Sequence, residues 1–226
     1  MLRTALLALA LPALFACSGG SNDNPSGAPV GPSTSSDSLV REAQQLTEAE
    51  LEDTLPTLSD MPAIFSPTKD DDSDEDDKSF LCGADVERFE QRNAEANVGY
   101  LAQVGVSATQ FSFGVSQFDS AEVAVEQVQA FGDAMDSCDK FTSDGDTYTV
   151  APMSAGRSGD DTVAVKLTAK SAGFAVGVNV VMVRTGPSLV MSLSATIGLA
   201  RGSTIDDLVR LTEETVDRYE AAAGIS

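Results

Sequence analysis

The segment SAEVAVEQVQAFGDAMDSC, residues 120–138, has apolar side chains at a spacing that the segments before and after it do not share. Apolar residues that recur after four, three, four and three positions lie on one face of an α-helix. They are Ala124, Val128, Phe131, Met135 and Cys138. Asp119 or Ser120 is suited to cap a helix of about five turns. Glu122 and Glu126 match the dipole at its N-terminus.

The segments on both sides alternate apolar and polar residues, which is typical of β-strands. Such segments lie at residues 98–102, 111–115, 148–150, 163–169, 176–182 and 189–195. The sequence Arg184-Thr185-Gly186-Pro187 favours a tight turn, so the last two strands are expected to form a hairpin. A final helix is expected from about Ser203. Its apolar stripe contains Ile205, Leu208, Val209, Val216 and Tyr219.

The short connections between these strands favour antiparallel pairing over crossovers. The sequence therefore predicts an α+β fold, with an antiparallel sheet of about six strands and two long helices packed on one face. Two short helices are expected before it, the first from Asp37 or Ser38 to Leu46. The second begins with the capping-box sequence at residues 47–50 and ends before Pro56.

The N-terminus has the features of an export signal. Arg3 precedes an apolar run from Ala5 to Leu14 that is too short to cross a bilayer. The end of this run, Leu14-Phe15-Ala16-Cys17, resembles the bacterial lipobox, which directs lipid attachment to its Cys. Residues 1–16 are predicted to be a lipoprotein signal peptide, Cys17 the lipidated residue, 17–37 a flexible tether and 38–226 the folded domain. An ordinary signal with an incidental cysteine is the alternative.

Cysteine usage and charge agree with export. Once Cys17 is assigned to lipid, Cys82 and Cys138 remain, and such a pair in an exported protein is most simply a disulfide. Two free thiols are the alternative. The net charge is −21, with 35 acidic and 14 basic residues, so the chain repels nucleic acid and anionic lipid headgroups. Binding to DNA or RNA and direct electrostatic binding to the membrane are therefore not expected, and the membrane is a partner through the N-terminal lipid anchor.

An acidic loop is predicted at residues 69–79, around the run DDDSDEDD from Asp70 to Asp77. Carboxylates are the ligands that Ca²⁺ prefers, but an EF-hand starting at Asp70 would need glycine where Glu75 stands and an acid where Leu81 stands. No metal site is predicted. Weak cation binding by a solvated, self-repelling loop remains open.

Catalysis and cofactors are not expected. The chain has no histidine, which removes Ser-His-Asp and Cys-His arrangements and the commonest metal ligand. Polar side chains instead follow the strand positions between the apolar ones, and a polar face with little bulk can line a ligand cleft. The candidate ligand-binding residues are Gln110, Ser112, Ser116, Lys166, Asn179, Ser192 and Ser194. The alternative is a sheet face that simply meets water.

The order of these features resembles the PknH-like extracellular sensor domain of actinobacteria. The features that carry this resemblance lie within residues 46–222 of this chain. They are a Leu-Pro…Asp-Met-Pro loop, a Cys, two strands, the helix quoted above, and a terminal hairpin with a helix. The resemblance implies a sheet and two long helices that shape a ligand cleft, and Cys82 with Cys138 would match one family disulfide. The second family disulfide has no counterpart here.

Together these expectations describe a non-catalytic lipoprotein at the outer face of the cell membrane, with a sensor-like domain. Its partner would be an unknown small molecule, lipid or protein. A structural or lipid-carrier envelope lipoprotein is the alternative.

Overall fold

The computed structural model describes residues 43–68, 82, 92–143, 145–198 and 204–225. The helices are α1 (Glu48–Glu52), the 3-10 helix η1 (Leu58–Asp60), α2 (Ala121–Asp136) and α3 (Thr204–Ala223). The strands are β1 (Ser66–Pro67), β2 (Arg92–Val104), β3 (Ser107–Phe118), β4 (Lys140–Ser143), β5 (Asp146–Pro152), β6 (Asp161–Ser171), β7 (Phe174–Thr185) and β8 (Ser188–Ile197).

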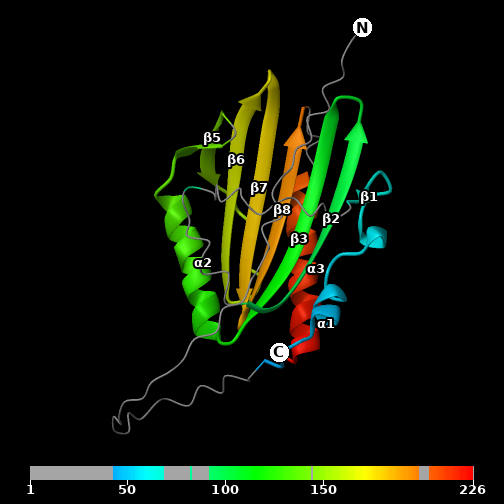
Figure 1. Ribbon diagram of the computed structural model, residues 1–226, viewed down its shortest axis with the longest axis vertical. Coiled ribbons are helices and arrows are strands. Elements are labelled where there is room, and N and C mark those ends of the chain that lie inside the picture. Colours follow the sequence, from blue (N-terminus) through cyan, green and yellow to red (C-terminus); the bar gives the residue numbers. More distant parts are fainter. Residues whose placement is uncertain (1–42, 69–81, 83–91, 144, 199–203, 226) are drawn as a thin grey trace.

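All eight strands form one sheet in the order β1-β2-β3-β8-β7-β6-β5-β4, and every neighbouring pair is antiparallel (Figure 1). The prediction of about six strands was wrong because both edge strands were missed. β1 has only two residues, one of them Pro67, and the four-residue β4 offers only Phe141 as an apolar residue. Segments this short contain too few positions to show alternation.

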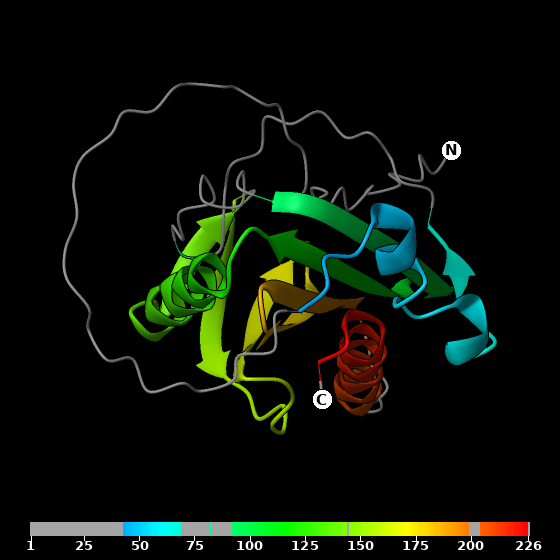
Figure 2. The same ribbon diagram turned by 90° about the horizontal axis from the view of Figure 1, so that it is seen from below.

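The long helices do not share a face of the sheet, so the predicted packing was also wrong. Val181 and Val183 of β7 pack in the core that contains Leu208 and Tyr219 of α3. Their neighbours Val180 and Met182 pack in a second core, with Val128 and Phe131 of α2. Adjacent residues of a strand point to opposite faces, so α2 and α3 cover opposite sides. In Figure 2 the two helices lie on either side of the strands.

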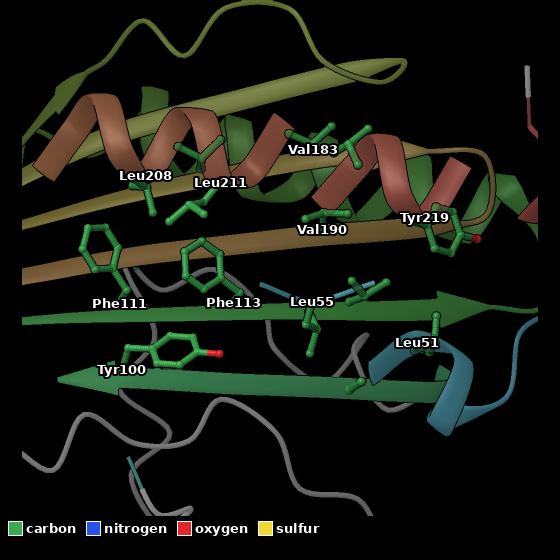
Figure 3. Packing of buried hydrophobic residues seen from close by; sticks show 14 of the residues in the cluster. Leu51, Leu55, Tyr100, Phe111, Phe113, Val183, Val190, Leu208, Leu211 and Tyr219 are labelled. Carbon is green, nitrogen blue, oxygen red and sulfur yellow. The ribbon is translucent and has the colours of Figure 1, made fainter. Parts of the chain in front are cut away.

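Side chains from α1, α3 and the sheet form the core under α3, here called the α3 core. Phe111 and Phe113 of β3 point toward Leu208 and Leu211 of α3, as Figure 3 shows. Leu51 of α1 joins the same core and is fully buried. Figure 3 also shows Tyr100, whose hydroxyl donates to the Pro56 carbonyl at 2.6 Å. The Leu-Pro loop is thereby fastened to β2.

The N-terminal segment is joined to α3 and β3 by a buried hydrogen-bond network. The Leu46 amide donates to Oε1 of Gln117 at 2.9 Å, and Nε2 of Gln117 donates to the Tyr219 hydroxyl at 3.1 Å. The Ser188 hydroxyl donates to the same phenolic oxygen at 2.6 Å. Burial raises the pKa of Tyr219, which remains a neutral phenol within this network.

The predictions for the individual helices differ in outcome. The capping box at Thr47 and Glu50 is present and starts α1. Residues 43–46 are not helical, so the first short helix does not reach Leu46, and its start lies outside the described residues. Ser120 is the N-cap of α2, but the helix ends at Asp136 and leaves Cys138 two residues beyond it. Of the described helices, none is both long and apolar enough to span a membrane.

Candidate functional site

The seven polar candidates do not lie on one face of the sheet. Ser112 is paired with Leu193, whose side chain belongs to the core under α2, here called the α2 core. Ser194 is paired with Phe111, which belongs to the α3 core. Directly paired residues of antiparallel strands share a face. Gln110, Ser112 and Ser116 therefore lie on the α2 side, and Lys166, Asn179, Ser192 and Ser194 on the α3 side.

The α3-side candidates are mostly closed off from solvent. Ser192 and Ser194 are fully buried and Asn179 nearly so, while Lys166 is exposed at the outer part of the sheet. Nδ2 of Asn179 donates to Oγ of Ser194 at 3.0 Å. Oδ1 of Asn179 and Oγ of Ser192 have no hydrogen-bond partner among the described residues. A ligand could reach these atoms only if α3 moved.

The α2-side candidates differ in exposure: Gln110 and Ser112 are half-buried, whereas Ser116 is buried. They belong to a surface that we call the β2–β3 strip. It comprises Glu95, Asn97 and Gly99 of β2 with Gln110, Ser112, Gly114 and Ser116 of β3. Glu95 is paired with Ser116 and Gly99 with Ser112, so the strip crosses both strands on one face. Its centre has little side-chain bulk, which leaves backbone and hydroxyl groups as its main features.

The strip has different neighbours along its two long sides. On the β8 side it adjoins Leu189, Met191 and Leu193, and the last two are only half-buried. On the outer side, the Thr68 amide donates to the Gly99 carbonyl at 2.9 Å, and the Thr68 hydroxyl lies close above Gly99. The strip therefore combines hydrogen-bonding groups with an apolar border, a combination that suits small-molecule recognition.

An ion pair lies at one end of the strip. Arg92 Nη1 is 2.7 Å from Glu95 Oε2, and the two side chains are only 5% and 15% exposed. Residues three apart would point to opposite faces of a regular strand. A bulge between Arg92 and Ala94 inserts one extra residue and brings both side chains to the same face.

Glu95 is the most perturbed acid described in the chain. Burial raises its pKa to about 7, and the Arg92 charge and a hydrogen bond with Asn97 only partly oppose this. The carboxyl can therefore bind or release a proton near neutral pH. Sequence reasoning missed this residue. Its place in the alternation puts it on the polar face, but nothing in the sequence marks one acid among 35 as buried.

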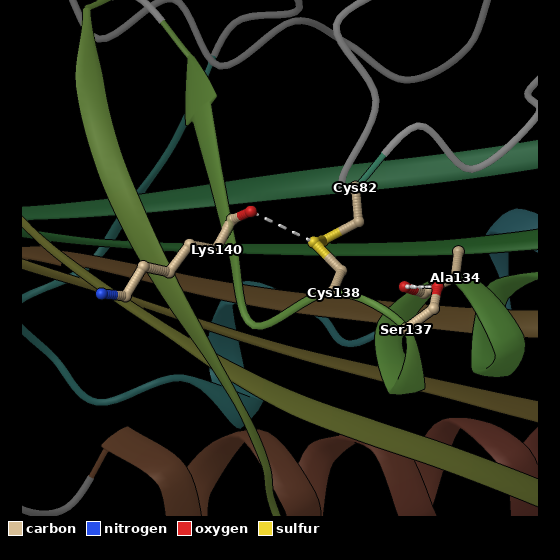
Figure 4. The surroundings of a disulfide bond; sticks show 5 residues. All are labelled: Cys82, Ala134, Ser137, Cys138 and Lys140. Carbon is tan, nitrogen blue, oxygen red and sulfur yellow. Dashed lines mark hydrogen bonds between the residues drawn. A yellow bond between two sulfur atoms is a disulfide. The ribbon is translucent and has the colours of Figure 1, made fainter.

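The predicted disulfide is present. Cys82 and Cys138 are joined with a Cα–Cα distance of 5.8 Å (Figure 4). Figure 4 also shows the Cys138 sulfur near the Lys140 carbonyl oxygen, at 3.6 Å. A disulfide sulfur carries no proton, so this is a contact rather than a hydrogen bond. The bond fixes the connection between α2 and β4.

The described residues contain no group of three or more Cys, Asp or Glu side chains that could hold a metal ion. The acidic run from Asp70 to Asp77, including any cation binding, lies outside these residues.

Sequence comparisons identify no relative, since no protein-family model and no curated protein matches the chain. A solved structure does match: the crystal structure of the extracellular domain of PknH from Mycobacterium tuberculosis. The match has a TM-score of 0.57 and 18% sequence identity, and covers 79% of this chain and 99% of that chain. The chain shares the fold of that domain. The PknH-like resemblance of the sequence is thus confirmed for the fold.

Proposed function

We propose that this chain is a non-catalytic, sensor-like ligand-binding lipoprotein, held at the outer face of the cell membrane by lipid on Cys17. The observation that carries the proposal is the fold shared with the PknH extracellular domain over nearly the whole of that domain. The β2–β3 strip supplies the binding surface. The ligand is a small molecule with polar groups along one side and an apolar edge.

Each part of the strip has a role in this proposal. The hydroxyl of Ser112 and the amide of Gln110 offer hydrogen bonds to the polar side of the ligand. Met191 and Leu193 contact its apolar edge. Glu95 lies at the end of the strip, where a ligand that donates a hydrogen bond or carries positive charge would favour the ionised carboxylate. Binding would then release a proton near neutral pH.

The anchor is tested by Cys17→Ser in the full chain. The variant should remain uncleaved, carry no acyl chains by intact-mass measurement, and change its membrane fractionation. A variant that matures and fractionates as the parent does would contradict the lipoprotein assignment.

The binding surface is tested by native mass spectrometry of protein purified from its own host. Ser112→Leu fills the strip and should abolish retention of a co-purifying small molecule. Lys166→Leu, an exposed change on the opposite face, is the matched control and should retain it. Loss in the control alone would move the site to the α3 side. A parent that retains no small molecule would favour a structural role.

A further inference from the structure

Exposed apolar side chains gather at one end of the sheet. Six large apolar side chains are exposed among the described residues, and four of them belong to the β2–β3 or β6–β7 hairpin. These four are Leu101, Val104, Val106 and Phe174. Val106 is 76% exposed and Val104 is 64% exposed. We call residues 104–106 and 172–174 the hairpin tips.

The two hairpin tips end at the same height. Ala108 of β3 and Val176 of β7 both pair with Ile197 of β8, so the three residues form one row across the sheet. Val106 and Phe174 each lie two residues beyond this row. Three strand spacings separate the hairpins, or about 14 Å. A single flat surface could therefore contact both tips (Figure 1).

The charge of these hairpins differs from that of the chain. Residues 101–109 and 169–175 contain no Asp or Glu and one Lys, although the chain has 35 acidic residues. Side chains that enter the apolar part of a bilayer must be uncharged, because a buried charge is strongly disfavoured there. A protein interface of ordinary size would need a continuous complementary surface. Separate apolar side chains at equal height suit a fluid bilayer better.

The tether can bring these tips to the membrane that holds Cys17. The Gln44 amide donates to the Ala223 carbonyl, so the chain enters the domain beside the end of α3, opposite the hairpin tips. The 26 residue-to-residue steps between Cys17 and Ala43 span at most about 90 Å. The 12 residues of β7 span about 40 Å. The lipid and the hairpin tips can therefore reach one bilayer.

We infer that the hairpin tips insert Val106 and Phe174 into the surface of a lipid bilayer, as a second membrane contact distinct from Cys17. The inference rests on the proposed anchor only for bringing the domain to the membrane. The second contact would hold the domain with its tether end away from the bilayer.

The test exploits the absence of tryptophan from the chain. Val106→Trp and Phe174→Trp each introduce one reporter, and Ala221→Trp places a control on an exposed position of the last turn of α3. The full-length variants are reconstituted in phosphatidylcholine vesicles, with or without acyl chains brominated near the headgroup. Both tip reporters should shift to shorter emission wavelength and lose most of their emission to bromine. The control should do neither.

Charge variants provide a second measurement. Val106→Asp added to the Phe174→Trp reporter should restore most of the quenched emission, whereas Leu58→Asp, an exposed apolar position on neither hairpin, should not. A shift without quenching would place the tips against protein and overturn the inference. Unchanged emission at both tips, or equal quenching at Ala221→Trp, would also overturn it. Failure of the anchor is detected separately by the Cys17→Ser mass and fractionation.

Discussion

Val180 and Val181 are neighbours in β7, yet they pack in different cores: Val180 with α2 and Val181 with α3. Both are 1% exposed. A sheet covered on both faces needs apolar residues at consecutive positions, and the run from Val180 to Val183 meets this requirement. The central strands therefore join the two helical layers into one cooperative unit, and changes on either face should affect the stability of the whole domain.

The disulfide should contribute substantially to that stability. Cys82 and Cys138 are 56 residues apart, and closing a loop of this length stabilises by about 4 kcal/mol in the chain-entropy model. Reduction, or replacement of both cysteines by alanine, should lower the melting temperature by many degrees. Calorimetry of both forms measures this. Non-reducing peptide mapping should recover the linked pair, and free alkylation of the native protein would contradict it.

Alanine substitutions at two nearby serines of β8 should have different effects on the free energy of unfolding. Ser192 and Ser194 are fully buried on the same face of β8, but among the described residues only Ser194 has a hydrogen-bond partner, the side-chain amide of Asn179. Ser194→Ala should destabilise by about 1–3 kcal/mol, because it leaves a buried donor unpaired. Ser192→Ala removes an unpaired hydroxyl and should be neutral or stabilising. Urea unfolding measures both, and an equal loss would mean that Ser192 has a water or ligand partner.

Tyr219→Phe should weaken the junction between α3, β3 and the N-terminal segment. The change leaves the Gln117 amide and the Ser188 hydroxyl without their acceptor in a buried site, at a cost of about 1–3 kcal/mol. Ser188→Ala provides the matched test. Its effect should shrink in the Tyr219→Phe background, because the bond it removes is already lost. Strict additivity of the two changes would argue against a shared network.

Glu95 should make the domain less stable as pH rises through mildly acidic values. Its pKa is raised from 4.5 to about 7 in the folded state, so the folded chain holds more protons than the unfolded chain between these values. Stability therefore falls from about pH 4.5 to about pH 7, by roughly 1–2 kcal/mol after solvent screening. Glu95→Gln should flatten this slope. Glu52→Gln, an exposed control, should preserve it.

The acidic run should be separable from the fold. Replacing residues 70–77 by a Gly/Ser linker of equal length should leave the melting temperature nearly unchanged, apart from a small gain at low salt from reduced repulsion. Thermal unfolding with and without millimolar calcium tests this. A large calcium-dependent stabilisation of the parent, absent from the linker variant, would establish a metal site in the run.

Local patterns in the sequence predicted the individual elements well. The spacing in 120–138 gave α2 within two residues at its end, and alternation located β2, β3 and β5 to β8. The stripe of α3 was recognised through Leu208 and Tyr219, although Leu211, equally buried, was missed. These features depend on local spacing, which one sequence displays directly.

The arrangement of the elements could not be predicted in the same way. The consecutive apolar residues of β7 indicate burial on both faces of the sheet. The prediction considered only the alternate apolar positions, and it therefore packed both helices on one face. The same assumption grouped Ser112 with Ser194, which strand pairing separates. The bulge that brings Arg92 to the side of Glu95 and the pairing of Glu95 with Ser116 of another strand are not visible in the local pattern, so nothing near Glu95 in the sequence signals its burial.

The two described ends of the chain meet at the β7–β8 turn. A Cβ at Gly186 would contact both Ala43 and Ile225. A fluorescent protein fused after the C-terminus would therefore sit beside the tether. A circular permutant could join these ends with a short linker and open the chain elsewhere at an exposed turn. Such a permutant would keep both cores but attach the tether at a different point of the domain. The orientation of the domain could then be changed without changing its fold.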